Sequence, residues 1–188
     1  MEEKVLVQRS KEGDEEAFAL LVKKYKTKVF NLAYSLTRDR EIADDLAQEV
    51  FIKAYFAIPK FHLKSEFGTW LYRITVNHIR DYLRKKTRMK EISLDDLAIS
   101  QEDETLIREK EDIDEQKRKI LYRLLDELTE KHKLILTLRD IQGLSYGEIA
   151  KILKISPGTV DSRLHRARKM LRKKIMPFLR KKGGVHEM

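Results

Sequence analysis

Apolar residues recur every three or four positions along most of the chain, a pattern that predicts α-helices and an all-α fold. The amphipathic runs cover about residues 15–36, 41–58, 68–86, 120–128, 134–141, 145–154 and 157–175. Asp14 and Asp39 stand just before two of these runs, where aspartate commonly caps a helix. Only 7 glycines and 3 prolines interrupt the pattern, so we expect nearly all of the chain to be helical.

The last two runs carry the most specific local signals. Ser145 and Glu148 form the S-x-x-E pattern of a capping box, and Ser156 followed by Pro157 is typical of a second helix start. Two helices joined by so few residues cross steeply, as in a DNA-reading helix-turn-helix. Lys154 occupies the turn position at which many such motifs have glycine, so the turn departs from the common pattern there.

The second of these helices is apolar on one face and basic on the other. Its polar face and flanks carry hydroxyls and cations at Thr159, Ser162, Arg163, Arg166 and Lys169. Arginine can pair bidentately with guanine and lysine neutralises phosphate, so this face suits the major groove of DNA. A solvated basic face on an ordinary bundle helix is the alternative, and the capped turn favours nucleic acid.

The helix at 41–58 turns acids and large apolar side chains outward. Its inner stripe consists of Ala43, Leu46, Ala47, Val50 and Ala54, and its outer face of Asp44, Asp45, Gln48, Glu49, Ile52 and Phe56. Acids around exposed apolar residues predict a docking surface for a basic partner helix, but a solvated face fits this segment equally well. A divalent-metal site is less well supported, because no oxygen-rich loop accompanies the carboxylates.

A loop of about ten residues follows Pro59 and contains Phe61, Lys64 and Phe67. Aromatic side chains can stack on an unstacked base, and a lysine can hold the nucleic-acid backbone. Phenylalanines that form a hydrophobic plug beneath the loop are an equally common alternative. The next helix collects Trp70, Arg73, Asn77, Arg80 and Arg84 on the face opposite a broad apolar arc. Tryptophan can stack on a base and asparagine can bond a base edge, so this face is a candidate nucleic-acid surface. His62 and His78 have no spaced metal-binding or catalytic partners and are interpreted as ordinary polar residues or phosphate contacts.

Composition divides the chain into two basic halves. Residues 91–115 are rich in acids and contain only two bases, which is typical of a flexible linker. We therefore expect a first small helical domain at 1–90, an acidic linker at 91–116, a second domain at 117–182 and a disordered tail at 183–188. A linker that lies against the basic faces is an alternative to a solvated one.

The net charge and the amino-acid composition of the whole chain restrict the possible classes of protein. The net charge of +9 favours polyanionic partners but does not choose among DNA, RNA and anionic lipid. The absence of cysteine excludes disulfides and thiolate metal sites, and no metal or cofactor is expected. The charged N-terminus is unlike a signal peptide, and no apolar run approaches the ~20 residues that span a bilayer, so we expect no membrane insertion.

Three segments in order, 41–55, 67–86 and 144–171, resemble the extracytoplasmic-function (ECF) group of bacterial sigma factors, and the resemblance covers nearly the whole chain. It implies core RNA polymerase binding through the clamp helices of the largest subunit at Asp44, Asp45, Gln48, Glu49 and Ile52. It implies minus-ten promoter contacts at Phe61, Lys64, Phe67, Trp70, Arg73, Asn77, Arg80 and Arg84. It implies minus-thirty-five contacts at Thr159, Ser162, Arg163, Arg166 and Lys169.

The same resemblance implies a cytoplasmic, non-enzymatic subunit that directs core RNA polymerase to promoter DNA and is held inactive by an anti-sigma factor, often at the membrane. Asp161 departs from the family pattern, in which a basic residue is common. Two rivals remain to be tested. One is an autonomous helix-turn-helix regulator, which would need a dimer interface and a palindromic site. The other is a metal-dependent nuclease that would use Asp44, Asp45 and Glu49.

Overall fold

The computed structural model describes residues 2–62, 65–92 and 123–183, and every regular element in these ranges is a helix. The order is α1 (Glu3–Lys11), α2 (Glu15–Thr37), α3 (Arg40–Ala57), η1 (Ile58–Lys60), α4 (Phe67–Ile92), α6 (Glu130–Leu136), η3 (Thr137–Ile141), α7 (Tyr146–Leu153) and α8 (Pro157–Gly183). The all-α prediction is confirmed. The predicted linker lies outside the described residues apart from 91 and 92, which end α4, and so does the tail beyond Gly183.

The predicted caps start the helices where the sequence places them. The Asp14 carboxylate accepts a hydrogen bond from the backbone N–H of Ala17 at 2.9 Å, and Asp39 accepts one from Ile42 at 3.0 Å. Each bond satisfies a donor that the first turn of a helix leaves without a partner. Between α2 and α3, Arg38 adopts the left-handed conformation with φ 59°, which lets the chain reverse direction.

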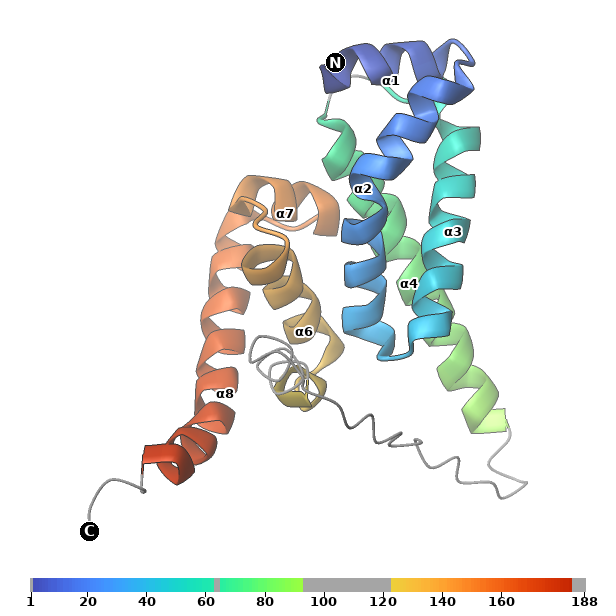
Figure 1. Cartoon of the computed structure of the whole chain (residues 1–188). Coiled ribbons are helices and arrows are strands. Elements are labelled where there is room, and N and C mark those ends of the chain that lie inside the picture. Colours follow the sequence, from blue (N-terminus) through green and yellow to red (C-terminus); the bar gives the residue numbers. More distant parts are fainter. Residues whose placement is uncertain (1, 63–64, 93–122, 184–188) are drawn as a thin grey trace.

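Helices α2, α3 and α4 form a bundle, and α1 lies across one of its ends (Figure 1). The predicted inner stripe of α3 is entirely buried, at Ala43, Leu46, Ala47, Val50 and Ala54. Helix α1 was not predicted, because its charged sequence hides a short apolar stripe. That stripe buries Leu6 and Val7 in the cluster that also contains Ile58 of η1. The bundle therefore has an extra helix at the end where α4 begins.

The second half consists of a helical stretch at 123–126 followed by α6, η3, α7 and α8. Val160, Leu164 and Ala167 of α8 are buried, as the predicted apolar stripe requires. Gly143 has φ +73°, a conformation that glycine adopts easily at the end of a helix, and separates η3 from α7. Helix α8 continues through Pro177 to Gly183, the first residue of the predicted tail. A proline removes only one backbone bond, and this one lies near the end of a long helix.

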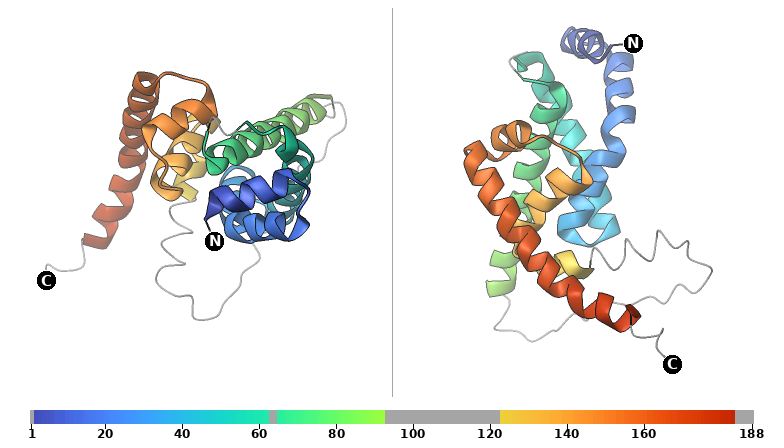
Figure 2. Two further views of the ribbon diagram at one scale, coloured as in Figure 1. Left: turned by 90° about the horizontal axis from the view of Figure 1, so that it is seen from above. Right: turned by 90° about the vertical axis from the view of Figure 1, so that its left-hand side faces the viewer.

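The two halves pack against each other. Figure 1 and the left view of Figure 2 place α6 and α7 between α8 and the α2–α4 bundle. Helix α7 packs directly on α4, and α6 packs on α2. One apolar cluster contains residues of both halves, including Leu32 of α2, Ile79 of α4 and Leu134 of α6. The nucleic-acid faces predicted for α4 and α8 therefore belong to one packed unit in this structure.

Candidate functional site

The outer face of α3 presents acids and apolar side chains to solvent, as its periodicity predicts. Asp44, Asp45, Gln48 and Glu49 are all exposed, and the Gln48 amide donates to Asp44 at 2.8 Å. Ile52 is 57% exposed and Phe56, one turn further on, is 76% exposed. Large apolar side chains this exposed, with carboxylates beside them, are suited to contact with a partner that carries both methylenes and positive charge.

A groove of about 1040 Å³ runs between α2 and α3 beside this face. Its lining combines apolar residues with charges of both signs, at Val22, Lys26, Phe30, Arg40, Glu41, Asp44, Asp45, Gln48 and Phe51, among others. Asp44, Asp45 and Gln48 belong both to the groove and to the predicted docking face. The groove gives the acidic surface a concave, partly apolar edge of the kind in which a helix can lie.

His78 of α4 lies against α3, and sequence spacing gave no sign of its contacts. Its side chain is 11% exposed, with Nε2 at 2.6 Å from the Glu49 carboxylate and Nδ1 at 2.6 Å from Nζ of Lys53. The Glu49 contact is close but not aligned as a hydrogen bond. The Lys53 ammonium can only donate, so Nδ1 accepts and the ring hydrogen is assigned to Nε2. His78 therefore keeps the opposite charges of Glu49 and Lys53 apart on α3.

Four of the predicted polar residues on α4 reach solvent. Arg73 and Asn77 are exposed, and the exposed Arg84 forms an ion pair with Asp81 at 2.9 Å. Arg80 is only partly exposed because its guanidinium pairs with Glu130 of α6 at 3.1 Å. One predicted nucleic-acid contact is thus occupied by a carboxylate from the other half of the chain.

Trp70 does not lie on the exposed face, so the sequence prediction of its position is wrong. It is 8% exposed and packs with Phe61 and Phe67, at ring-centroid distances of 4.8 and 5.4 Å. Phe61 and Phe67 are each 4% exposed. The reason is that η1 and the unpredicted α1 cover the first turn of α4, and all three rings join the cluster that contains Leu6 and Val7. For the two phenylalanines the alternative of a hydrophobic plug is confirmed, and Lys64 lies outside the described residues.

The helix-turn-helix forms as its capping signals predict. The Ser145 hydroxyl accepts from the Glu148 N–H at 3.2 Å, and Glu148 accepts from the Ser145 N–H at 2.7 Å, which completes the capping box. The Ser156 hydroxyl accepts from the Thr159 N–H at 3.1 Å and starts α8. Lys154 takes the left-handed conformation with φ 54° at the end of α7, the conformation that glycine adopts most easily.

The polar face of α8 is available to a partner. Arg166 and Lys169 are exposed, while Thr159, Ser162 and Arg163 are half-buried at its edge. A second groove of about 630 Å³ follows this helix and is lined by His165, Arg168, Lys169, Arg172, Lys173 and Met176. It adds Arg172 to the predicted basic face. Asp140 pairs with Arg168 at 2.5 Å and anchors the helix to η3.

Comparison with known proteins identifies the two halves separately. Residues 21–89 match Sigma-70 region 2, and residues 118–171 match Sigma-70, region 4. The ECF RNA polymerase sigma-E factor of Escherichia coli K12 is 39% identical, and the match covers 95% of this chain and 97% of that protein. The chain belongs to the ECF RNA polymerase sigma factors. It is a sigma factor that directs RNA polymerase to promoters.

Two further likenesses cover most of this sigma factor. The RNA polymerase sigma-H factor of Pseudomonas aeruginosa is 37% identical, over 93% of this chain and 94% of its own. The fold is similar to that of the sigma factor RpoE of Bartonella quintana, solved in complex with the anti-sigma factor NepR. That likeness has a TM-score of 0.68 at 24% identity and covers 83% of this chain and 94% of that one. Across residues 2–62, 65–92 and 123–183, no helix is long and apolar enough to cross a membrane.

Proposed function

We propose that three faces of this sigma factor divide the work of initiation: α3 binds core RNA polymerase, α4 reads and opens the minus-ten element, and α8 reads the minus-thirty-five element. The observation that carries the proposal is the position of these faces. The α3 face and α4 fall within the region 2 match, and the start of α8 falls within the region 4 match. Each face presents exposed polar side chains, such as Asp45 on α3, Asn77 on α4 and Arg166 on α8.

The α3 face supplies the polymerase contact. Asp44, Asp45, Gln48 and Glu49 offer negative charge, and Ile52 offers an exposed apolar centre. Complementary charge steers association and sets the register, while buried apolar contacts supply the affinity. The clamp helices of the largest polymerase subunit are the partner implied by the family resemblance.

Helix α4 supplies the minus-ten contacts through its solvent-facing residues. Arg73, Asn77 and Arg84 are exposed, and they combine phosphate neutralisation with a side chain able to bond a base edge. The aromatic cluster of Phe61, Phe67 and Trp70 has a different task in this proposal. It holds the start of α4 and the end of η1 in a fixed relation, so that the loop between them presents its residues to a flipped base.

Helix α8 supplies the minus-thirty-five contacts through Thr159, Ser162, Arg163, Arg166 and Lys169. The steep turn after α7 places the start of α8 outward, and recognition helices read base edges from that end. We propose Arg166 as the principal base contact, since its guanidinium is exposed and can pair bidentately with guanine. Asp161, next to Ser162 on α8, is exposed, and its carboxylate disfavours a phosphate nearby.

The remaining functional statements are also proposals. The protein acts in the cytoplasm, catalyses no covalent step and uses no cofactor. An anti-sigma factor holds it inactive, by analogy with the structurally similar Bartonella quintana protein, which was solved in complex with the anti-sigma factor NepR. An autonomous regulator and a nuclease are not favoured by a chain whose two halves match sigma regions 2 and 4.

Reversing the charge of the docking face tests the proposal. The double variant Asp45→Lys with Glu49→Lys should weaken binding to core polymerase by at least about tenfold, because it places like charges in a complementary interface. Both side chains are exposed, so circular dichroism should be unchanged. Glu12→Lys with Glu16→Lys makes the same change in net charge at exposed positions outside α3 and should bind normally. Equal affinity of both folded double variants would contradict the assignment of α3.

A further inference from the structure

One acidic side chain, Asp161, stands near the start of the otherwise basic helix α8. It is the fifth residue of the helix and is exposed. It lies one helical turn before His165 and two turns before Arg168, on the same side of the helix. Within the residues that the structure describes, the Asp161 carboxylate nevertheless takes part in no hydrogen bond or ion pair.

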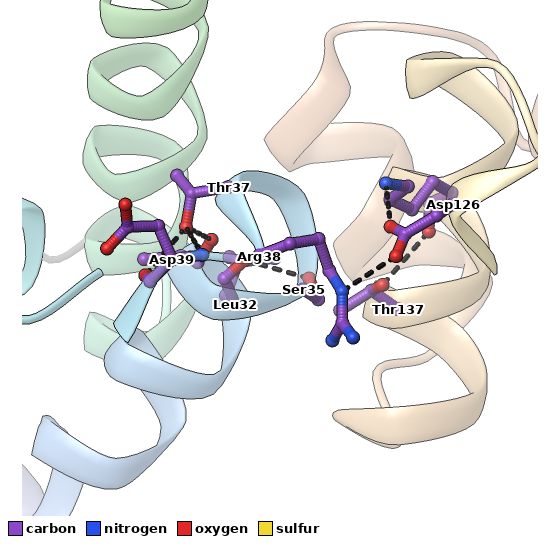
Figure 3. Close-up of polar contacts among 9 residues, drawn as sticks. Leu32, Ser35, Thr37, Arg38, Asp39, Asp126 and Thr137 are labelled. Atoms are coloured by element: carbon purple, nitrogen blue, oxygen red, sulfur yellow. Dashed lines mark hydrogen bonds and ion pairs between the residues drawn. The ribbon is translucent and has the colours of Figure 1, made fainter. Parts of the chain in front are cut away.

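The other carboxylates of residues 123–183 all have partners inside the protein. The partners are Arg38 (Figure 3) and Lys133 for Asp126, Lys174 for Glu127, Arg80 for Glu130, Arg168 for Asp140 and the capping box for Glu148. A cation on α8 is thus paired with Asp140 of η3 while Asp161, on the same helix, remains available to an external donor.

Helix stability does not explain an acid at this position. A carboxylate favours the positive end of a helix, but this effect is confined to the first turn, and the first turn of α8 contains no acid. The cap is supplied by Ser156, whose hydroxyl accepts from the Thr159 N–H at 3.1 Å. Because a carboxylate repels DNA phosphates, Asp161 can gain a favourable contact in DNA only from a hydrogen-bond donor on a base.

The surroundings of Asp161 favour such a contact. The neighbouring hydroxyls are bonded within the helix, since Ser162 donates to the backbone carbonyl of Thr159 at 3.2 Å and the hydroxyls of Ser156 and Thr159 lie 2.8 Å apart. Gly158 is one turn before Asp161, and a Cβ added there would meet no other described part of the protein within 4 Å. DNA can therefore approach the helix closely beside Asp161.

We propose that Asp161 determines specificity within the minus-thirty-five element by accepting a hydrogen bond from the amino group of a cytosine. The proposal rests on the minus-thirty-five role given above to α8. An ionised carboxylate only accepts, and the amino donors of the major groove are N4 of cytosine and N6 of adenine. The adenine amino group lies between two acceptors, its own N7 and O4 of the paired thymine, which repel a carboxylate. The cytosine amino group has an acceptor on one side only.

The position of Asp161 on α8 is compatible with this contact. The N-terminal residues of a recognition helix are the ones that reach base edges. Arg166 follows five residues later, about 7.5 Å along the helix, which corresponds to roughly two base-pair steps of about 3.4 Å. The cytosine therefore lies in the same upstream element as the guanine proposed for Arg166.

Selection from randomised DNA tests the base preference. Core polymerase with this protein transcribes a promoter whose upstream element is randomised, and the transcribed DNA is sequenced. The unchanged protein should enrich cytosine at one position, roughly five- to thirtyfold over each other base, and Asp161→Ala should abolish that preference alone. Glu16→Ala, an equal change in net charge at an exposed position of α2, should leave it intact. Unchanged preferences in Asp161→Ala, or adenine in place of cytosine, would overturn the proposal.

Removal of one amino group from the DNA gives an independent readout. Pyrimidin-2-one, which lacks the amino group of cytosine, replaces the selected base. The complex of polymerase with the unchanged protein should then lose affinity at least about fivefold more than the complex with Asp161→Ala. Equal losses would assign the cytosine to another residue. A uniform gain in affinity of Asp161→Ala for every sequence would mean that the carboxylate only repels phosphate. Either result would overturn the cytosine contact.

Arg166→Ala distinguishes a failure of this proposal from a failure of the proposed function. If α8 reads the upstream element, this variant should relax the preference for guanine at a different position from the one affected by Asp161→Ala. A selection that recovers no upstream element, or one that Arg166→Ala leaves unchanged, contradicts the role of α8 itself. An upstream element that depends on Arg166 but not on Asp161 contradicts only the cytosine contact.

Discussion

At the scale of single residues, His78 connects the two helices to which we assign polymerase and promoter binding. Its ring lies between Glu49 and Lys53, which are one turn apart on α3. Residues at this spacing pair readily when nothing separates them. We propose that the histidine prevents Glu49 from pairing with Lys53 and is thereby a positioning residue for the docking face.

We expect His78→Ala to weaken core-polymerase binding about two- to tenfold, because Lys53 can then pair with Glu49 and neutralise part of the docking face. The measurement is the affinity of labelled protein for core enzyme, with His62→Ala, an exposed histidine, as the control. A double-mutant cycle with Glu49→Ala should show coupling between the two positions. Strict additivity would mean that His78 acts only through stability.

Tyr72 provides a pH-dependent readout of the interface between the halves. Burial, with a smaller contribution from the charge of Glu148, raises the pKa of Tyr72 to about 12 from its ordinary value of 10.0. The neutral phenol is thus favoured in the folded state. Its contribution to stability is complete below pH 10 and is lost as the pH rises towards 12.

Tyr72→Phe should therefore reduce the loss of stability between pH 10 and pH 12, while costing about 0.5–1.5 kcal/mol at neutral pH for the bond to Gln142. Urea unfolding at a series of pH values measures both effects. Tyr55→Phe, whose hydroxyl lies at the surface, is the matched control. A slope above pH 10 that is the same in Tyr72→Phe as in the unchanged protein would contradict this account.

The sequence could not predict the burial and contacts of side chains that pack against elements distant in the chain. Trp70 has arginines and asparagine at helical spacing around it, so its periodicity predicts an exposed position. The cover comes from η1 and α1, whose contact with the first turn of α4 has no local signal. The contacts of His78 could not be predicted for the same reason, because its partners lie 25 and 29 positions earlier on another helix.

At the scale of elements, the helices themselves could be predicted because their signals are local. Capping residues at Asp14, Asp39, Ser145 and Ser156 lie within three positions of the N–H groups that they bond. The apolar stripes of α3 and α8 repeat at the helical period and are buried as expected. Helix α1 is the exception, since nine residues with few apolar positions give too weak a period to detect.

The turn of the helix-turn-helix carries a measurable strain at Lys154. A non-glycine residue in the left-handed region costs roughly 1–2 kcal/mol, and glycine avoids this cost but loses more conformational entropy. Lys154→Gly should thus stabilise the protein by up to about 1 kcal/mol, seen as a higher urea midpoint. Lys151→Gly, inside α7, should destabilise it by a similar amount. Destabilisation by both changes would show that Lys154 makes a contact that outweighs its backbone strain.

At the scale of the whole molecule, the packing of the two halves could not be derived from the sequence. Acid-rich residues 91–115 favour separate domains, and that prediction concerns residues that lie largely outside the described ranges. One feature did carry information about the interface. The apolar arc of α4 is broad, and the structure shows that Tyr72, Val76 and Ile79 share a cluster with α6 and α7. A wide apolar arc on a polar-faced helix is thus a signal of a second packing partner.

At the same scale, we expect the chain to work as a dissociable subunit of polymerase and not as an autonomous regulator. A single helix-turn-helix without a dimer partner makes few base contacts, so the free protein should bind duplex DNA weakly and with strong dependence on salt. Attachment to polymerase makes the second promoter contact effectively intramolecular and raises avidity. The protein should therefore recognise the same DNA specifically in the presence of core enzyme and only weakly in its absence.

The most direct test is to sequence the 5′ ends of transcripts made from genomic DNA by core polymerase with and without this protein, at physiological salt. We expect a defined set of start sites that share two upstream elements and that appear only when both components are present. In a parallel binding measurement at that salt, the protein alone should bind no duplex DNA specifically. Tight, sequence-specific retention of a palindromic duplex by the protein alone, with no new start sites, would contradict the account.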